Sequence, residues 1–217
     1  MAAVATLTTV CGGFVLDGVP ASAATPECGS ACGSVFSREL GTYADPNVVE
    51  AVLDGVPRVG QPVILKEASS SDPSEDIVAH RSSVSALYAA GMVSAEVNEN
   101  YANLLGVQQE YAPDGVGTGL CVGLAKTAFQ NEGLTLQSCS VPGRTIWIID
   151  PAVVPFFPIV NGSTTTFARP FAMDLPRDEI VSGRQTLQIH VRHEKFLTDE
   201  KTLPDSQLWG FHQGPLN

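Results

Sequence analysis

The sequence predicts an all-β protein. Short runs rich in Val, Ile, Leu and Phe alternate with clusters of Gly, Pro, Asn and Asp, which is typical of many short strands joined by turns. Of the 217 residues, 44% are hydrophobic and only 16% are charged, which favours a packed globular chain over a disordered one. This length suits one all-β domain with a sizeable core.

Four runs give the clearest strand patterns. Each is rich in β-branched, aromatic or other apolar residues and is bounded by turn residues. They are PVILK at 62–66, GLTLQSC at 133–139, TIWIID at 145–150 and TLQIHV at 186–191.

Helical spacing occurs in one place. Val93, Val97, Tyr101, Leu104 and Leu105 recur at the period of one helix face, and Ser94 stands where an N-cap is expected. The pattern predicts a short helix or ordered loop over residues 94–106, inserted between strands.

Three copies of one unit follow one another along the chain. Each copy has a first strand, a turn with glycine, a second strand and a polar loop, and it ends in a strand that opens on Ile77, Trp147 or Trp209. The copies are spaced roughly seventy residues apart. We therefore expect a β-trefoil, a single domain over 24–217 with repeats at about 34–93, 107–150 and 156–213, and with the helix between the first two.

The N-terminal segment resembles a signal peptide over residues 1–23. An apolar stretch is followed by Ala21-Ser22-Ala23, the small-x-small pattern that precedes a cleavage site. Two features depart from the usual pattern, because no Lys or Arg precedes the apolar part and Asp17 lies late in it; a buried N-terminal strand is the alternative. The pattern predicts a secreted, extracellular protein that begins at Ala24.

Four cysteines remain after such cleavage, an even number in an oxidising compartment. The economical pairing is Cys28 with Cys32 and Cys121 with Cys139. A zinc site is not expected, because C-x3-C and a distant cysteine pair lack histidines at ligand spacing.

Charge and hydropathy exclude several partners. The formal net charge is −11, and an acidic surface repels phosphates, so nucleic acid is not expected. The most apolar run, IWIIDPAVVPFFPIV, is interrupted by one aspartate and three prolines, so we expect no membrane span.

Two sets of motifs resemble the ricin B-type lectin repeat: CVGL…GLTLQSC…TIW and AMDLP…TLQIHV…DSQLWGF. Gln207-Leu208-Trp209 matches the Gln-x-Trp motif of that family, and Cys121 and Cys139 match the disulfide that joins the first two strands of one repeat. The likeness covers about residues 34–213. The chain is also similar to secreted bacterial proteins that carry ACGSVFSRELGTYADPN near the mature start, a likeness that implies no activity.

The lectin resemblance implies a carbohydrate site in the third repeat. There Asp174 takes the place of the sugar-binding carboxylate, Gln188 that of the amide and His190 that of the aromatic residue. Gln207 is also in place, although Ser206 stands where the family has Asn. The alternative is structural: Asp174 caps a turn and Gln207 holds backbone groups.

The second repeat lacks this set. Gly123 occupies the carboxylate place, Gln137 the aromatic place and Thr145 the Gln place. We therefore expect this repeat to be structural, with Trp147, like Trp209, in the core.

No catalytic residue, cofactor or metal site is predicted. The chain has no Gly-x-Ser-x-Gly elbow, and His190 and His193 stand an odd number of residues apart in a strand, which directs them to opposite faces. The acidic run SSSDPSED at 69–76 is a candidate calcium loop, and a solvated loop that starts a turn is the alternative.

These observations together predict a secreted, non-enzymatic, carbohydrate-binding β-trefoil whose partner is a carbohydrate or cell-surface glycan. The alternative is a protein-interaction or protease-inhibitor module of the same fold with no sugar site, because two of three repeats lack the sugar-binding set.

Overall fold

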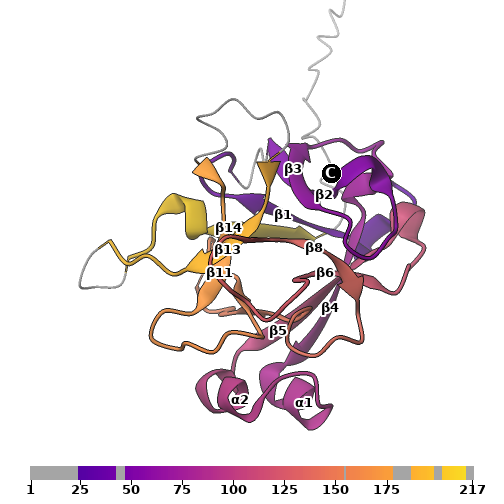
Figure 1. Ribbon diagram of the computed structural model, residues 1–217. Coiled ribbons are helices and arrows are strands. Elements are labelled where there is room, and N and C mark those ends of the chain that lie inside the picture. The colour runs from indigo at the N-terminus through magenta and orange to yellow at the C-terminus, as the bar shows by residue number, and fades with distance from the viewer. Residues whose placement is uncertain (1–23, 43–46, 154, 178–186, 198–201, 214–217) are drawn as a thin grey trace, which may run out of the picture.

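The computed structural model describes residues 24–42, 47–153, 155–177, 187–197 and 202–213. The predicted signal peptide at 1–23 lies outside the described residues. Strands dominate the described chain and helices are short (Figure 1). Within these ranges, no helix has the length and apolar character that a membrane crossing requires.

The strands are short, as the turn-rich sequence predicts. In chain order they are β1 (Gly33–Ser37), β2 (Val48–Val52), β3 (Val63–Glu67), β4 (Ile77–Ser83), β5 (Leu105–Tyr111), β6 (Leu120–Gly123), β7 (Glu132–Gly133), β8 (Thr135–Ser138), β9 (Trp147–Ile149), β10 (Val160–Asn161), β11 (Phe171–Asp174), β12 (Leu187–Gln188), β13 (His190–His193) and β14 (Trp209–Gln213).

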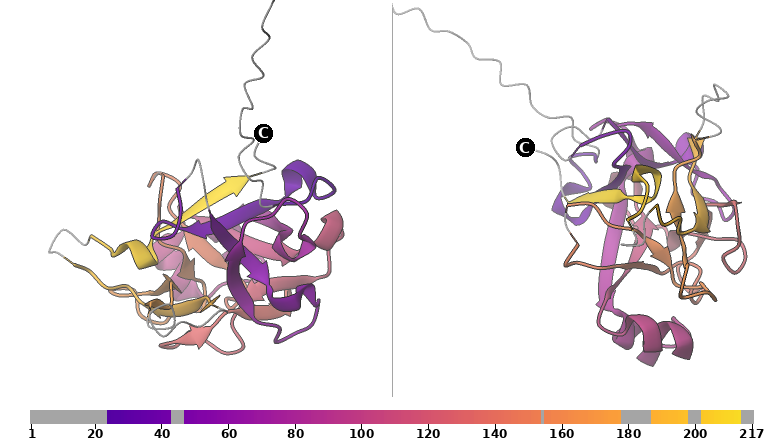
Figure 2. Two further views of the ribbon diagram at one scale, coloured as in Figure 1. Left: turned by 90° about the horizontal axis from the view of Figure 1, so that it is seen from above. Right: turned by 90° about the vertical axis from the view of Figure 1, so that its left-hand side faces the viewer.

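Two α-helices lie between β4 and β5, side by side beyond the ends of these strands (Figures 1 and 2). They are α1 (Val84–Ala89) and α2 (Ala95–Tyr101). The Ser94 hydroxyl caps α2 by accepting a hydrogen bond from the Val97 amide at 3.2 Å. The helix ends at Tyr101, five residues before the end of the predicted range, because Leu105 opens β5.

Short 3-10 turns precede or follow several strands. They are η1 (Gly29–Ala31), η2 (Leu53–Gly55), η3 (Pro73–Glu75), η4 (Pro113–Gly115) and η5 (Asp205–Gln207).

Three antiparallel pairs are β4 with β5, β9 with β10, and β1 with β14. The helices α1 and α2 lie between β4 and β5, and β1 and β14 are far apart in the sequence. Three hairpins accompany them, β2–β3, β6–β8 and β11–β13. The hairpins contact one another where β12 pairs with β3 and β13 pairs with β7. Because β1 pairs with β14, the first and last strands of the described chain lie side by side, as both views of Figure 2 show.

Trp147 and Trp209 lie in the core, with exposed fractions of 1% and 0%, as predicted. Each indole N–H donates to a backbone carbonyl, that of Val122 at 2.9 Å and that of Met173 at 3.0 Å. These bonds satisfy the one polar group of each ring, which burial would otherwise leave unpaired. Both tryptophans therefore hold the hairpin that precedes them.

Both predicted disulfides are confirmed as pairs. Cys121 of β6 bonds to Cys139 just after β8, with the two Cα atoms 4.9 Å apart. Cys28 bonds to Cys32, with Cα atoms 5.7 Å apart. The first pair joins the two strands of one hairpin, which the lectin resemblance implied.

Candidate functional site

A cleft of about 1040 Å³ opens beside the β11–β13 hairpin, and we call it the Asp174 cleft. Its walls come from β11, β13, the loop at 130–131 and the segment that contains η5. The polar side chains that line it are Gln130, Asn131, Arg169, Asp174, Arg177, Arg192, His193, Lys195, Thr202, Asp205 and Ser206.

Asp174 ends β11 and lies at the wall of this cleft with 7% of its surface exposed. Its Oδ2 accepts a hydrogen bond from Gln207 Nε2 at 3.1 Å, and the Ser206 side chain bonds to the same carboxylate. Burial raises the pKa of Asp174, while the positive charges of Arg192 and Arg177 and the two hydrogen bonds act against that rise. The result is one oriented carboxylate in a mostly cationic cleft.

Gln207 is fully buried, so its role is to position other groups. Its Oε1 accepts from the Lys195 amide at 2.7 Å, and its Nε2 donates to the His193 carbonyl at 3.1 Å as well as to Asp174. Gln207 therefore holds backbone groups, as the structural alternative expects, and orients Asp174. No atom of Gln207 lines the cleft.

Gln188 and His190 lie away from the cleft lining. Gln188 belongs to β12, which pairs with β3, and its Nε2 donates to the Leu134 carbonyl at 2.9 Å. His190 pairs with Asp174 on one side and with Gly133 on the other. The structure thus brings Asp174 and Gln207 together but separates Gln188 and His190 from the cleft.

His193 is the ring that lines the cleft. It stacks on Phe171, with ring centroids 3.9 Å apart and an interplanar angle of 25°, and its Nδ1 lies 2.7 Å from the Arg169 carbonyl oxygen. Side chains alternate along β13, so His190 and His193 are expected to point to opposite faces. Once the position of the cleft is known, this alternation predicts that His193, and not His190, faces it.

The cationic residues of the cleft were not among the predicted site residues. Arg192 donates from Nε to Asn131 Oδ1 at 2.6 Å, and Arg169 donates from Nε to the Glu194 carbonyl at 2.9 Å. Arg177 forms an ion pair with Glu39 at 2.7 Å. The sequence signal is the run VRHEK at 191–195, which holds two basic residues and one acidic residue in a chain of net charge −11.

The position that corresponds to Asp174 in the preceding motif is Gly123, and no side chain fits there. A Cβ atom on Gly123 would lie 2.8 Å from the Arg144 carbonyl oxygen and 2.9 Å from Thr145 Cγ2. Glycine is needed here because the backbones approach so closely. This position therefore offers no carboxylate, in line with the structural role predicted for that repeat.

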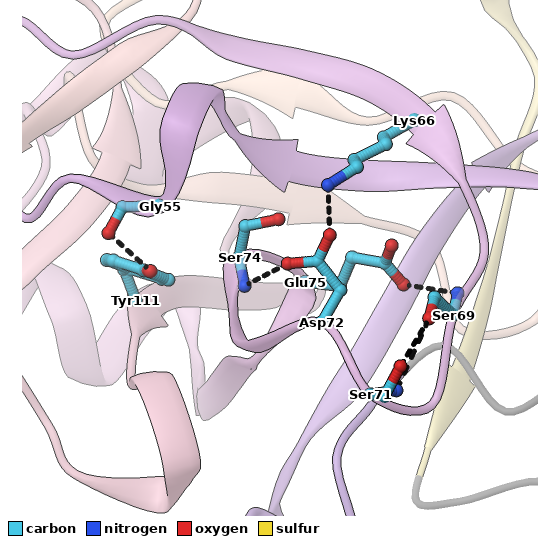
Figure 3. Close-up of polar contacts among 8 residues, drawn as sticks. All are labelled: Gly55, Lys66, Ser69, Ser71, Asp72, Ser74, Glu75 and Tyr111. Carbon is cyan, nitrogen blue, oxygen red and sulfur yellow. Dashed lines mark hydrogen bonds and ion pairs between the residues drawn. The ribbon is translucent and has the colours of Figure 1, made fainter.

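The acidic loop at 69–76 is held by its own hydrogen bonds (Figure 3). Lys66 forms an ion pair with Asp72, whose Oδ1 also accepts from the Ser74 amide at 2.9 Å. Glu75 is 1% exposed and accepts from the Ser69 amide at 2.9 Å, and burial raises its pKa to about 8. A neutral Glu75 and an Asp72 paired with lysine offer a cation little charge, which disfavours calcium. The loop does start a turn at Asp72, as the alternative expects, but its last residues are buried rather than solvated.

Among the described residues, one group has metal-ligand spacing: Cys28, Cys32 and Asp76. The two sulfurs are bonded to each other. Asp76 accepts hydrogen bonds from the Thr25 amide at 2.8 Å, from its hydroxyl at 2.7 Å and from the Asp114 amide at 2.9 Å. This cluster fastens the N-terminal segment to the body of the protein.

Neither a protein-family model nor a curated protein matches the sequence. Among solved structures, the designed threefold symmetric protein ThreeFoil matches 84% of this chain and 99% of its own, at 10% identity and a TM-score of 0.52. The solution structure of the mdaA-1 domain matches 88% of this chain and 98% of its own, at 14% identity and a TM-score of 0.50.

The exo-β-1,3-galactanase 1,3Gal43A from Clostridium thermocellum matches 85% of this chain but only 30% of its own length, at 8% identity and a TM-score of 0.52. Likenesses at such low identity bear on the fold alone. They show that the chain has the β-trefoil fold, so the predicted fold class is confirmed at that level.

Proposed function

We propose that this chain is a secreted, non-enzymatic β-trefoil protein of three repeats that binds carbohydrate through the Asp174 cleft. The three strand pairs β1–β14, β4–β5 and β9–β10, with one hairpin for each, support the three-repeat organisation. The two disulfides support an oxidising, extracellular location.

The observation that carries the sugar proposal is the fixed Asp174 carboxylate at the wall of an open cleft. A carboxylate held by Gln207 and Ser206 keeps acceptor capacity for the neighbouring hydroxyls of a sugar. Such charge-assisted hydrogen bonds are about twice as strong as neutral ones. Gln130 and Asn131 add amide groups on the same cleft.

His193 supplies the ring of the proposed site. Its stacking on Phe171 fixes the imidazole plane at the cleft, where it can cover the apolar face of a sugar. This role was expected of His190, so the proposal transfers it by three residues along β13.

One test is calorimetry on the mature protein with sugars chosen from a glycan array. Asp174→Asn keeps the shape of the side chain and an acceptor for Gln207, so the fold should persist while sugar affinity falls at least tenfold. Asp54→Asn is the matched control, because Asp54 is exposed and lies outside the cleft lining. Binding unchanged in Asp174→Asn would overturn the site.

The second candidate is a protein-interaction or inhibitor module. An apolar groove of about 420 Å³ favours it, lined by Tyr101, Leu104, Val153, Phe167, Leu203 and other side chains. If neither the glycan array nor titration with millimolar sugar shows binding, this candidate replaces the carbohydrate proposal.

A further inference from the structure

The Asp174 cleft concentrates positive charge on an acidic protein. Among the described residues, four lysines and arginines line it together with two carboxylates, Asp174 and Asp205. The net charge of the whole chain is −11, so this local excess of cations opposes the general trend. A cleft of one charge sign focuses the field on ligands of the opposite sign.

The cations are not all placed around Asp174. Phe171 pairs with His193 in the β11–β13 register, and continuing that register beyond the strand ends places Arg169 opposite Lys195. Consistent with this, Arg169 Nε bonds to the Glu194 carbonyl. Phe171 and Asp174 are three positions apart in β11, which corresponds to roughly 10 Å of strand, and Arg169 lies beyond Phe171.

This separation divides the cleft into two ends. At the Asp174 end, the carboxylate can accept hydrogen bonds from hydroxyl donors, and the charges of Arg192 and Arg177 act on it. The other end presents the exposed Lys195 ammonium and the Arg169 guanidinium. The guanidinium has five N–H groups, and one of them donates to the Glu194 carbonyl. Arg192 lies between the two ends, since it pairs with Ala172.

We infer that the cleft selects an acidic oligosaccharide, and this inference rests on the proposed carbohydrate function. Hydroxyls of one sugar unit bind at Asp174, and the neighbouring unit covers the His193 ring, which lies nearer the Arg169 end because His193 pairs with Phe171. A carboxylate or sulfate on that neighbouring unit binds at Arg169 and Lys195, where guanidinium and ammonium groups form charge-assisted hydrogen bonds to the anion.

The test compares three probes by calorimetry with the full mature protein: a neutral oligosaccharide, its uronate-containing counterpart and a sulfated counterpart. At least one acidic probe should bind ten times or more tightly than the neutral one, and that preference should shrink as salt rises from 50 to 300 mM because salt screens exposed charges. The two acidic arms identify whether the anion is a carboxylate or a sulfate.

Two variants separate this inference from the proposed function. Arg169→Gln with Lys195→Gln should reduce acidic binding to the neutral level and leave neutral binding unchanged, whereas Asp174→Asn should weaken both. Arg58→Gln, an exposed arginine outside the cleft, is the control and should change neither.

The failures are distinct. Equal binding of neutral and acidic probes, unaffected by the double variant, would overturn the acidic selectivity and keep the sugar site. The carbohydrate site itself would be overturned if no probe bound, or if Asp174→Asn bound the probes with the same affinity as the parent.

Discussion

Glu75 and Gln207 occupy corresponding places in the chain. Each ends a 3-10 turn, η3 or η5, and each stands two residues before a core residue, Ile77 or Trp209. Each accepts a hydrogen bond from a distant backbone amide, Gln207 at 2.7 Å and Glu75 at 2.9 Å.

The two side chains differ in what they donate. Gln207 also donates two hydrogen bonds through Nε2, whereas an ionised Glu75 has no proton to donate and its buried Oε1 has no hydrogen-bond partner. Burial raises the pKa of Glu75 to about 8, above its ordinary value near 4.5, so at neutral pH it carries a proton and resembles glutamine.

We expect Glu75→Gln to stabilise the protein at alkaline pH. The stability associated with protonated Glu75 is complete below about pH 4.5 and is lost as pH rises through about 8, because the folded state then holds a buried charge. The variant should raise the free energy of unfolding at pH 8 by about 1–3 kcal/mol and change it little at pH 4.5. Urea unfolding at both pH values measures this.

The control for that prediction is Glu99→Gln on the exposed face of α2, which should alter neither value. Part of the pH dependence should survive in Glu75→Gln, since burial also raises the pKa of Glu50 to about 8. A variant less stable than the parent at pH 8 would contradict the assignment of a proton to Glu75.

At the scale of elements, the clearest departure from sequence expectation is the run TLQIHV. It reads as one strand, but Leu187–Gln188 pairs with β3 while His190–His193 pairs with β11 and β7. Because the neighbouring strands change at Ile189, the surroundings of each side chain change there too. The alternation of apolar and polar residues within TLQIHV does not tell which strands it pairs with. The lectin resemblance named Asp174 and Gln207, which the structure brings within hydrogen-bond distance, whereas the position of His193 and the cleft arginines depends on strand partners that the sequence pattern does not give.

The helices show a similar limit. Val97 and Tyr101 give a helical pattern that the structure matches over α2. α1 has only six residues, too few for a periodic pattern to emerge, and it is held by packing of Val84 with Val93 and Val97. Strands, turns and core tryptophans were predictable because each depends on local pattern and burial.

The two disulfides should differ in their effect on stability. The Cys121–Cys139 bond spans 18 positions and should contribute about 3 kcal/mol through the entropy of the unfolded chain, whereas Cys28–Cys32 spans four and should contribute about 2 kcal/mol. Cys139→Ser should therefore lower Tm by roughly 6–12 °C, and Cys32→Ser by less. Scanning calorimetry ranks the two, and a larger loss for Cys32→Ser would contradict this order.

At the scale of the whole molecule, the first described residues are built into the fold. Ala24 and Thr25 are 1% and 3% exposed, and Thr25 makes two hydrogen bonds to Asp76. A chain that starts at Ala24 keeps both bonds. Intact-mass analysis of secreted protein should therefore show a start at Ala24, and a folded cytosolic product that retains Met1 would contradict both the signal peptide and the secreted location.

The pairing of β1 with β14 has a consequence for biosynthesis. Synthesis proceeds from the N-terminus, so β1 cannot pair with β14 until residues 209–213 have left the ribosome. Contacts between such distant segments make folding slow, and until β14 is made β1 lacks the strand with which it pairs. A chain that cannot complete its fold during translation stays unfolded until synthesis is nearly finished, and an unfolded chain is what the proposed secretion through a membrane channel would require.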